Sequence, residues 1–375
     1  MLKTMFPTIE RESSMLGFGC MRFPCTPDGK IYEAEAIRMI RHAIDNGVTY
    51  IDTAYPYHGG ESEIVVGKAL QDGYREKVIL ATKLPCWNVH KHEDMMAILD
   101  EQLQKLQTDH IDFYLMHAMN AQRLEEMQGY DYKRFLDEAV AQGKIRYPSF
   151  SFHDGYDAFM RILDDYDWKM CQVQMNILDD ENQATLRGIR EAGKRGIGVV
   201  IMEPLRGGLL ANPPADVKAV YDAFPDKRSP VEWAFRYLYA MPEVVTILSG
   251  MSSWEQTIDN LRIFDIPGRP VLTEAENALF RQVKDTYMAR MKTGCTGCRY
   301  CQPCPMGVAI PHIFQNYDAT RLRAEPNYSK GYAKVIADEH DASRCVQCGQ
   351  CEAACPQHLP IIRYLQEIHA ECCGE

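Results

Sequence analysis

Four polar residues in the first third of the chain have the types needed to move a proton onto a carbonyl oxygen. Asp52 closes the run VTYID, Lys83 closes KVILATK and His117 closes HIDFYLMH, while Tyr57 lies five residues after Asp52. A phenol, with a pKa of about 10, is a poor acid–base group at neutral pH unless a nearby ammonium lowers that pKa. An aspartate can keep the lysine charged, and a histidine can orient the carbonyl oxygen. These residue types predict acid–base chemistry on a carbonyl or an alcohol.

Eight of the 14 cysteines fall in two short runs near the C-terminus, spaced C-x2-C-x2-C-x2-C-P and C-x2-C-x2-C-x3-C-P. The second spacing is that of bacterial ferredoxins with two [4Fe–4S] clusters, in which the fourth cysteine of each run ligates the other cluster. We therefore predict two [4Fe–4S] clusters with crossed ligation. The first would be held by Cys295, Cys298, Cys301 and Cys355, and the second by Cys345, Cys348, Cys351 and Cys304.

Zinc is the alternative occupant of these cysteine runs. A zinc site usually takes two C-x2-C pairs for one ion. Two triplets, each followed by a displaced fourth cysteine and a proline, suit two cubane clusters better, although the spacing of the first run is slightly shorter than the ferredoxin pattern.

Short apolar or β-branched runs alternate with helical patterns through most of the chain. Eight such strand–helix units favour a closed parallel (β/α)8 TIM barrel over an open sheet. Barrel active sites lie at the C-terminal ends of the strands, so Asp52, Lys83 and His117 are expected at one mouth. The expected strands are residues 17–21, 48–52, 77–83, 110–117, 145–152, 170–176, 197–202 and 244–250.

The pattern changes after the eighth unit. The barrel is expected over residues 1–270, and residues 271–375 are expected to form a small α-helical ferredoxin-like iron–sulfur domain, because that part shows helical fragments and cysteines but no strand pattern. Thr273 and Glu276 form a capping-box pattern that predicts a helix over residues 273–291.

Composition limits the partners and the compartment. The chain has 375 residues and a formal net charge of −11, which argues against nucleic acid as a partner. No run of about 18 apolar residues predicts a membrane span, and the N-terminus shows no signal-peptide pattern. Cysteine-rich runs in a chain without an export signal indicate a reducing, cytoplasmic compartment.

The motifs DTAYPYHGGESE, ATK and YLMH, in this order and spacing, resemble the aldo-keto reductases, with a likeness that runs from about residue 15 to 265. The resemblance implies a (β/α)8 barrel that binds NADP(H) or NAD(H) across the strand mouth. It implies a catalytic tetrad of Asp52, Tyr57, Lys83 and His117, with Tyr57 as the proton donor. With its cysteine runs, the whole chain resembles the subgroup whose barrel is followed by a 4Fe–4S ferredoxin-like domain.

The resemblance also implies cofactor-binding residues, with several departures from the family pattern. Where the family usually has an asparagine after the serine of the fifth strand, this chain has Phe152, and Met202 replaces the aromatic that stacks on the nicotinamide. Gln256 stands where an arginine often binds the 2′-phosphate of NADPH. The expected cofactor-binding residues are Ser151, Gln172, Ser249, Gly250, Met251, Ser252, Gln256, Asp259 and Asn260.

Two functions fit these patterns. The first is an oxidoreductase that interconverts a small-molecule carbonyl and alcohol with a nicotinamide cofactor, while its clusters exchange electrons with a redox partner protein such as a ferredoxin. The second is a plain aldo-keto reductase, or a binding barrel, with structural or redox-sensing clusters. A flavin stays open as a cofactor, because a direct path from hydride to a one-electron cluster usually needs one and a barrel mouth can hold FMN without a motif.

Overall fold

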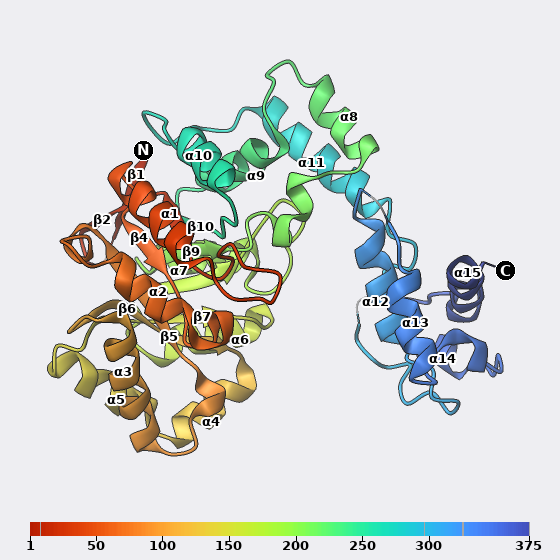
Figure 1. Cartoon of the computed structure of the whole chain (residues 1–375). Coiled ribbons are helices and arrows are strands. Elements are labelled where there is room, and N and C mark those ends of the chain that lie inside the picture. The colour runs from red at the N-terminus through yellow and green to blue at the C-terminus, as the bar shows by residue number, and fades with distance from the viewer. Residues whose placement is uncertain (8, 296, 325, 375) are drawn as a thin grey trace. The chain divides into compact units, whose positions relative to one another are not determined.

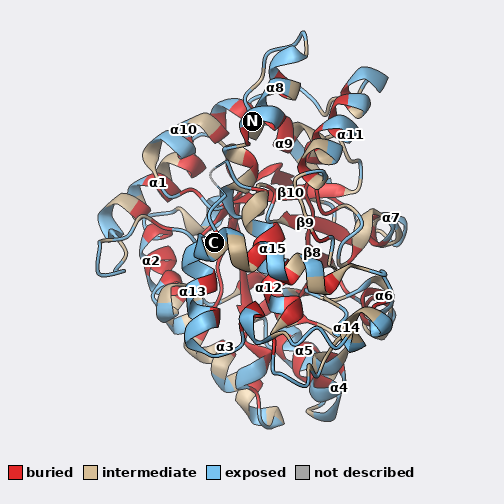
Figure 2. Cartoon of the chain, turned by 90° about the vertical axis from the view of Figure 1, so that its right-hand side faces the viewer, coloured by how far each residue is buried: buried red, intermediate tan, exposed pale blue. Residues whose placement is uncertain are grey.

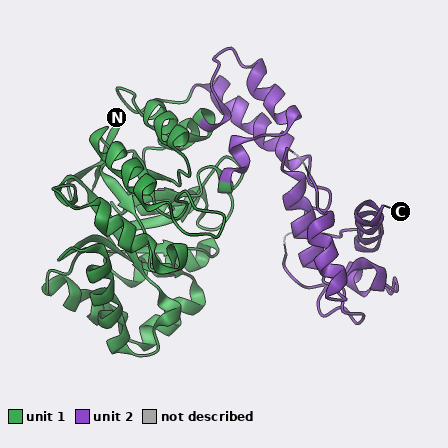
Figure 3. Cartoon of the chain, viewed as in Figure 1, with its two compact units in different colours: residues 1–207, 232–272 green, residues 208–231, 273–375 purple. Residues whose placement is uncertain are grey.

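The computed structural model describes residues 1–7, 9–295, 297–324 and 326–374. The chain forms two compact units (Figure 3). The barrel unit comprises residues 1–207 and 232–272, and the C-terminal unit comprises residues 208–231 and 273–375. The division expected between residues 1–270 and 271–375 stays a prediction, and the contacts add residues 208–231 to the second unit.

In the described part of the chain, eight parallel strands close into a barrel in which neighbours in sequence are neighbours in space (Figure 1). The predicted (β/α)8 fold is confirmed, and each strand lies within or beside its predicted range. The strands are β3 (Leu16–Gly19), β4 (Tyr50–Asp52), β5 (Ile79–Leu84), β6 (Ile111–Met119), β7 (Ile145–Phe152), β8 (Met170–Gln174), β9 (Gly198–Met202) and β10 (Val244–Ser249).

Helices follow the strands along the chain and carry apolar faces. In Figure 2 the strands β8, β9 and β10 are red because nearly all of their residues are buried. The helices up to the end of the barrel are α1 (Glu33–Asp45), α2 (Ser62–Ala69), α3 (His92–Leu106), α4 (Ala121–Gly129), α5 (Tyr132–Ala141), α6 (Tyr156–Asp165), α7 (Thr185–Lys194), α8 (Ala215–Ala223), α9 (Pro230–Tyr239) and α10 (Trp254–Ile263). Short 3₁₀ turns lie at η1 (Tyr57–Gly60), η2 (Arg75–Lys77), η3 (Cys86–Asn88) and η4 (Arg206–Ala211).

An antiparallel hairpin precedes the barrel, and the sequence patterns did not predict it. Strands β1 (Lys3–Phe6) and β2 (Arg11–Ser14) pair with each other. Phe6 is fully buried and packs on Phe113, with ring centroids 4.7 Å apart. The hairpin therefore places an aromatic side chain in the core of the barrel.

The C-terminal unit begins with the predicted helix. Helix α11 (Glu274–Met288) starts with the predicted capping box, in which Thr273 Oγ1 accepts from Glu276 N and Glu276 Oε2 accepts from Thr273 N. The described residues of this unit contain helices and turns but no strand, as predicted. After α11 they form α12 (Ile310–Arg321), α13 (Ser329–Ala337), η5 (Ala342–Arg344), α14 (Gln350–Ala354) and α15 (Ile361–Cys373).

A small apolar core joins the last helices of the C-terminal unit. Helices α12, α13 and α15 contact one another and bury Phe314, Tyr332 and Ile368, and several cysteines of both runs pack against this core. Among the described residues, we find no helix with the length and apolar character that crossing a bilayer requires.

Candidate functional site

Lys83 is the centre of a polar cluster at the mouth of the barrel. It lies near the C-terminal end of β5, and its side chain is 1% exposed. Its Nζ donates to both carboxylate oxygens of Asp52, at 2.8 and 3.0 Å, and to the carbonyl oxygen of Thr53 at 2.7 Å. Asp52 ends β4, the strand beside β5, so the sheet brings the two side chains together.

The pairing keeps the buried lysine charged. Burial on its own lowers the pKa of Lys83, but Asp52 and Tyr57 act in the opposite direction and together leave this pKa above its ordinary value. Burial raises the pKa of Asp52, and Lys83 opposes that rise. An ammonium in a dry site is stable only with such a partner, so Asp52 explains how a cation persists inside the barrel.

Tyr57 is the third residue that the lysine side chain contacts. It begins the turn η1, and Lys83 Nζ donates to its hydroxyl oxygen at 3.3 Å. Burial is the largest influence and raises the pKa of Tyr57, while Lys83 pulls the same pKa down. The expected lowering by the ammonium is therefore present but smaller than the effect of burial, and the phenol stays protonated, as a proton donor requires.

His117 lies opposite the tyrosine, on β6. The two rings are nearly perpendicular, with centroids 6.1 Å apart. Burial, followed by the charge of Lys83, lowers the pKa of His117 to about 2, so the imidazole is neutral. Its Nδ1 is buried and has no hydrogen-bond partner among the described residues. The structure thus gathers all four predicted residues at one mouth, where a phenol, an ammonium and a neutral imidazole can act on a single oxygen atom.

Two predicted cofactor residues lie side by side on β7 and β8. Ser151 and Gln172 are direct partners in the parallel register. Ser151 Oγ accepts from Ala118 N at 2.7 Å, whereas Gln172 Oε1 is buried without a partner in the described part of the chain. A buried amide oxygen without a donor is costly, so Gln172 suits a ligand that brings an N–H group, such as a carboxamide.

The predicted phosphate-binding turn follows β10, and hydrogen bonds with residues of α10 hold parts of it in place. Ser249 Oγ accepts from Asn260 Nδ2 at 2.8 Å, and Ser252 N donates to Gln256 Oε1 at 2.8 Å. Asp259 is engaged by Arg262 at 2.9 Å. Met251 is buried, so its side chain packs inside the protein at this turn.

Arg22 lies at the same turn, and sequence reasoning missed it. A Cβ atom added to Gly250 would lie 3.3 Å from three carbons of the Arg22 side chain, and one added to Gly207 would lie 3.6 Å from its Nη2. Arg22 is exposed and follows the first barrel strand in GCMRF. Its position after the first strand is the signal that could have found it, because loops after strands form the mouth.

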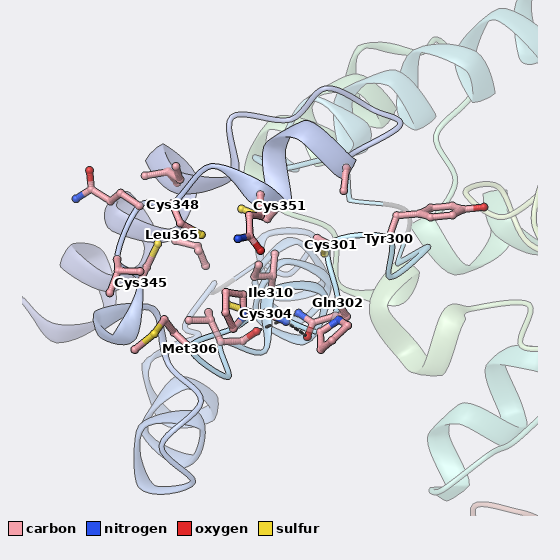
Figure 4. Close-up of a pocket in the computed structure, with 18 residues that line it drawn as sticks. Tyr300, Cys301, Gln302, Cys304, Met306, Ile310, Cys345, Cys348, Cys351 and Leu365 are labelled. Atoms are coloured by element: carbon pink, nitrogen blue, oxygen red, sulfur yellow. Dashed lines mark hydrogen bonds between the residues drawn. The ribbon is translucent and has the colours of Figure 1, made fainter.

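The cysteines of the two runs line two cavities in the C-terminal unit. One cavity is lined by Cys295, Cys298, Cys301 and Cys355, together with Phe314 and Pro356. The other has a volume of about 180 Å³ and is lined by Cys304, Cys345, Cys348 and Cys351, and by Cys301, which lines both cavities. Figure 4 shows labelled cysteines of both runs around this larger cavity.

The thiols surround cavities instead of converging on one point. In the ranges that the structure describes, no group of three His, Cys, Asp or Glu side chains is gathered closely enough to hold a single metal ion. Thiols that line an open space suit a bulky cluster, which carries four irons and four sulfides inside its cysteine ligands.

The comparisons with known proteins identify both parts of the chain. The model of the aldo/keto reductase family matches residues 15–283, and the chain therefore belongs to this family. A model of the 4Fe-4S dicluster domain matches residues 294–359, a range that includes all eight cysteines of the two runs. The predicted combination of an aldo-keto reductase barrel with a C-terminal 4Fe–4S domain is confirmed.

Individual relatives support the family assignment over different lengths. The chain is 41% identical over 114 residues to the aldo-keto reductase YhdN of Bacillus subtilis, an alignment that covers 28% of this chain but only 34% of that relative. The aldo-keto reductase AKR11C1 of Bacillus halodurans, in its holo form, is 26% identical with a TM-score of 0.64, over 76% of this chain and 96% of that chain. An aldo/keto reductase from Klebsiella pneumoniae, solved in complex with NADP and acetate, is 25% identical with a TM-score of 0.61, over 76% of this chain and 96% of that chain.

Proposed function

We propose that this protein is an oxidoreductase that interconverts a carbonyl and an alcohol with NADP(H) or NAD(H). The observation that carries the proposal is the position of Lys83 Nζ, which donates to Asp52 at 2.8 Å and to the hydroxyl of Tyr57 at 3.3 Å. The NADP in the Klebsiella structure supports the choice of cofactor.

When bound, the nicotinamide supplies the hydride and thus both electrons of the reduction. Gln172, with its unpartnered buried Oε1, and Ser151 would hold the carboxamide, and the turn from Ser249 to Ser252 would hold phosphate oxygens. The supporting observation is the fit of donors and acceptors, since the free oxygen of Gln172 matches the N–H of a carboxamide.

The residues of the barrel move the proton. Tyr57 donates its phenolic proton to the oxygen of the carbonyl, and Lys83 stabilises the phenolate that remains. Asp52 keeps Lys83 charged and in place. His117, which is neutral, orients the carbonyl oxygen through a ring nitrogen without competing for that proton.

The C-terminal unit is proposed to hold two [4Fe–4S] clusters with crossed ligation. The support is the lining of the two cavities, in which Cys355 joins the triplet of the first run and Cys304 joins the triplet of the second. Such clusters exchange single electrons, and we propose a redox partner protein such as a ferredoxin for that exchange. The two matching families give no support to the flavin that the sequence left open, and the proposal does not depend on one.

The reductase function is tested with Tyr57→Phe, which removes only the ionisable oxygen. A panel of aldehydes and ketones is assayed with NADPH and NADH, and the variant is expected to lose at least about 100-fold in kcat. Unchanged turnover in the variant, or no turnover of any carbonyl by the native protein, would overturn the proposal.

The role of the clusters is tested separately on anaerobically purified protein. Optical bleaching on addition of reduced ferredoxin, at a rate that depends on ferredoxin concentration, is expected for electron transfer. Clusters that no added protein or nicotinamide reduces, in a chain with full reductase activity, would favour a structural role.

A further inference from the structure

A cavity lies beside the proposed catalytic residues at the mouth of the barrel. It has a volume of about 390 Å³, and its lining includes Cys86, Trp87, Asn120 and Arg123. Cys86 and Trp87 belong to η3, directly after the strand of Lys83, while Asn120 and Arg123 come directly after the strand of His117. The cavity is therefore built from the turn η3 after β5 and from the start of helix α4 after β6, both beyond the C-terminal ends of their strands.

Trp87 connects this cavity to the catalytic histidine. Its ring centroid lies 5.0 Å from that of His117, and the guanidinium carbon of Arg123 lies 5.2 Å from the Trp87 ring. Trp87 is nevertheless 43% exposed as a residue. An indole that contacts a catalytic imidazole while it remains accessible is placed to contact a bound substrate.

Arg123 brings a permanent positive charge to the same place. Its Nη1 donates to the carbonyl oxygen of Ala118, the residue that follows His117. The charge of Arg123 is also one of the causes that lower the pKa values of His117 and His153, which places the guanidinium close to the mouth.

Arg123 forms no ion pair with the carboxylate that lines the same cavity. That carboxylate belongs to Glu126, whose Oε1 accepts from Gln122 at 2.7 Å. Among the residues that the structure describes, no carboxylate lies within ion-pair distance of Arg123. Nη1 of Arg123 is used by Ala118, but among the described residues Nε and Nη2 have no partner. In a chain with a net charge of −11, this half-buried arginine therefore keeps one edge of its guanidinium free to donate at the active-site mouth. A guanidinium binds a carboxylate through two parallel hydrogen bonds, which fixes orientation as well as position.

We propose that the substrates of this protein carry a carboxylate a few bonds from the reacting carbonyl, and that Arg123 binds this carboxylate while Trp87 packs on the chain between the two groups. The inference rests on the proposed function, since it names the substrate class of that site. It assigns Arg123 a role in substrate binding and specificity, with the chemistry left to Tyr57, Lys83 and His117.

The test compares short oxo-acids, such as 4-oxobutanoate and 4-oxopentanoate, with their methyl esters. The native protein is expected to prefer the acids in kcat/KM. Arg123→Gln is expected to lower kcat/KM for the acids at least about 30-fold, mostly through KM, and to change the values for the esters less than about threefold. Arg123→Lys keeps the charge without the fork and is expected to restore part of the loss.

Arg161→Gln is the matched control. Arg161 lies on α6, pairs with Glu125 at 3.1 Å and has a side chain that is 53% exposed. Arg161 does not line the cavity, so its replacement removes a positive charge of the same kind without changing the proposed site. Its acid-to-ester preference should equal that of the native protein. Equal losses for acids and esters in Arg123→Gln would assign the arginine a structural role and overturn the proposal, as would a native protein that prefers the esters.

Binding is measured independently of turnover. Calorimetric titration of the native protein and of Arg123→Gln with 4-oxopentanoate is expected to show an affinity that falls at least about 30-fold in the variant. If the native protein reduces no carbonyl but shows this difference, the reductase function fails while the carboxylate site stands. If esters are reduced normally and the binding difference is absent, the carboxylate site fails while the reductase function stands.

Discussion

Asp318 accepts hydrogen bonds from both the backbone amide and the hydroxyl of Thr293, at 3.0 and 2.6 Å. The same buried carboxylate accepts from Lys292 N at 2.8 Å and from Gly294 N at 2.9 Å. These four bonds hold the three residues that immediately precede Cys295. Helix α12, which carries Asp318, therefore fixes the backbone from which the first thiol extends.

We expect Asp318→Ala to reduce iron binding without touching a cysteine. Hydrogen bonds to a charged acceptor contribute about 1.5–3 kcal/mol each, and the variant leaves several backbone amides without a partner. Iron analysis on anaerobic protein should show a loss confined to about half of the total. Asp285→Asn, a change of an exposed carboxylate on α11, is the control and should keep the native iron content. Full iron content in Asp318→Ala would mean that the loop needs no such support.

Much of the barrel follows from the sequence because its strands are apolar runs that the helical patterns separate clearly. The hairpin of β1 and β2 was missed because each strand has four residues and the second, RESS, is polar. Its pairing depends on Phe6 reaching the buried ring of Phe113, a contact between residues far apart in the chain.

The candidate site likewise contains residues that the sequence predicts and residues that it does not. Asp52, Lys83 and His117 lie at or near the C-terminal ends of their strands, and the geometry of a parallel barrel brings strand ends together whatever the intervening sequence. Arg22, Arg123 and Asp318 gain their roles from tertiary neighbours: Gly250, Trp87 and Thr293. No local spacing records those contacts; for Arg22 the sequence gives only its place after the first strand, which marks the mouth but not the neighbour.

The buried ion pair of Lys83 and Asp52 should show strong coupling. Lys83→Met leaves the carboxylate of Asp52 buried without a partner, which costs about 3–5 kcal/mol. The double variant with Asp52→Asn should be more stable than Lys83→Met alone, as measured by urea unfolding of the barrel. The exposed pair of Lys68 and Glu33 in the barrel unit is the control, and its removal should cost about 1 kcal/mol or less. A double variant less stable than either single variant would contradict the prediction.

His117 should make the barrel less stable in mild acid. Its pKa is lowered to about 2 in the folded protein, below the ordinary value of about 6.5 that the unfolded chain has. Below pH 6.5 the unfolded chain therefore binds a proton at this residue that the folded one does not, and stability falls as the pH falls. Between pH 6.5 and the pKa of the folded state, the unfolding free energy falls by up to about 1.4 kcal/mol for each pH unit.

His117→Gln should remove this contribution. The difference in unfolding free energy between pH 7.0 and pH 5.5 is compared in the native protein and the variant, and the variant should lose about 1 kcal/mol less. His312→Gln, a change of an exposed histidine on α12, should leave the native pH dependence in place. Identical pH slopes for the native protein and His117→Gln would show that the imidazole is accessible to protons in the folded barrel.

Gln256 should relax the preference for a phosphorylated cofactor. Its amide accepts from Ser252 N and offers no charge to a 2′-phosphate, whereas an arginine would bind that phosphate through two hydrogen bonds. We expect the dissociation constants of NADPH and NADH to differ less than about 30-fold, or about 2 kcal/mol. Gln256→Arg should shift the ratio toward NADPH, and Gln282→Arg on α11 should not. A native preference above that ratio would point to another cation, and Arg22 beside Gly250 is placed to supply it.

The crossed arrangement of the cysteines predicts which cluster each single change damages. Cys355 lines the cavity of Cys295, Cys298 and Cys301, although it follows them by 54 to 60 positions in the sequence. Cys355 is only 8% exposed, so solvent has little access to its thiol. Cys304 belongs to the first run but lines the cavity of the second triplet. Cys355→Ser should therefore weaken the cluster of the first triplet, and Cys304→Ser that of the second.

Iron and sulfide analysis, with electron paramagnetic resonance of the reduced protein, distinguishes the two variants. The native chain should contain about eight irons and eight sulfides, and each variant should lose up to about four irons with a different remaining spectrum. Cys373→Ser, at an exposed cysteine outside both cavities, should keep the native spectrum. Each cluster would take three cysteines from one run and one from the other, so the two clusters link the same two segments. Loss of one cluster should therefore also lower the thermal stability of the other. If Cys355→Ser and Cys295→Ser leave different clusters intact, the two cysteines do not share a cluster and the crossed assignment is wrong.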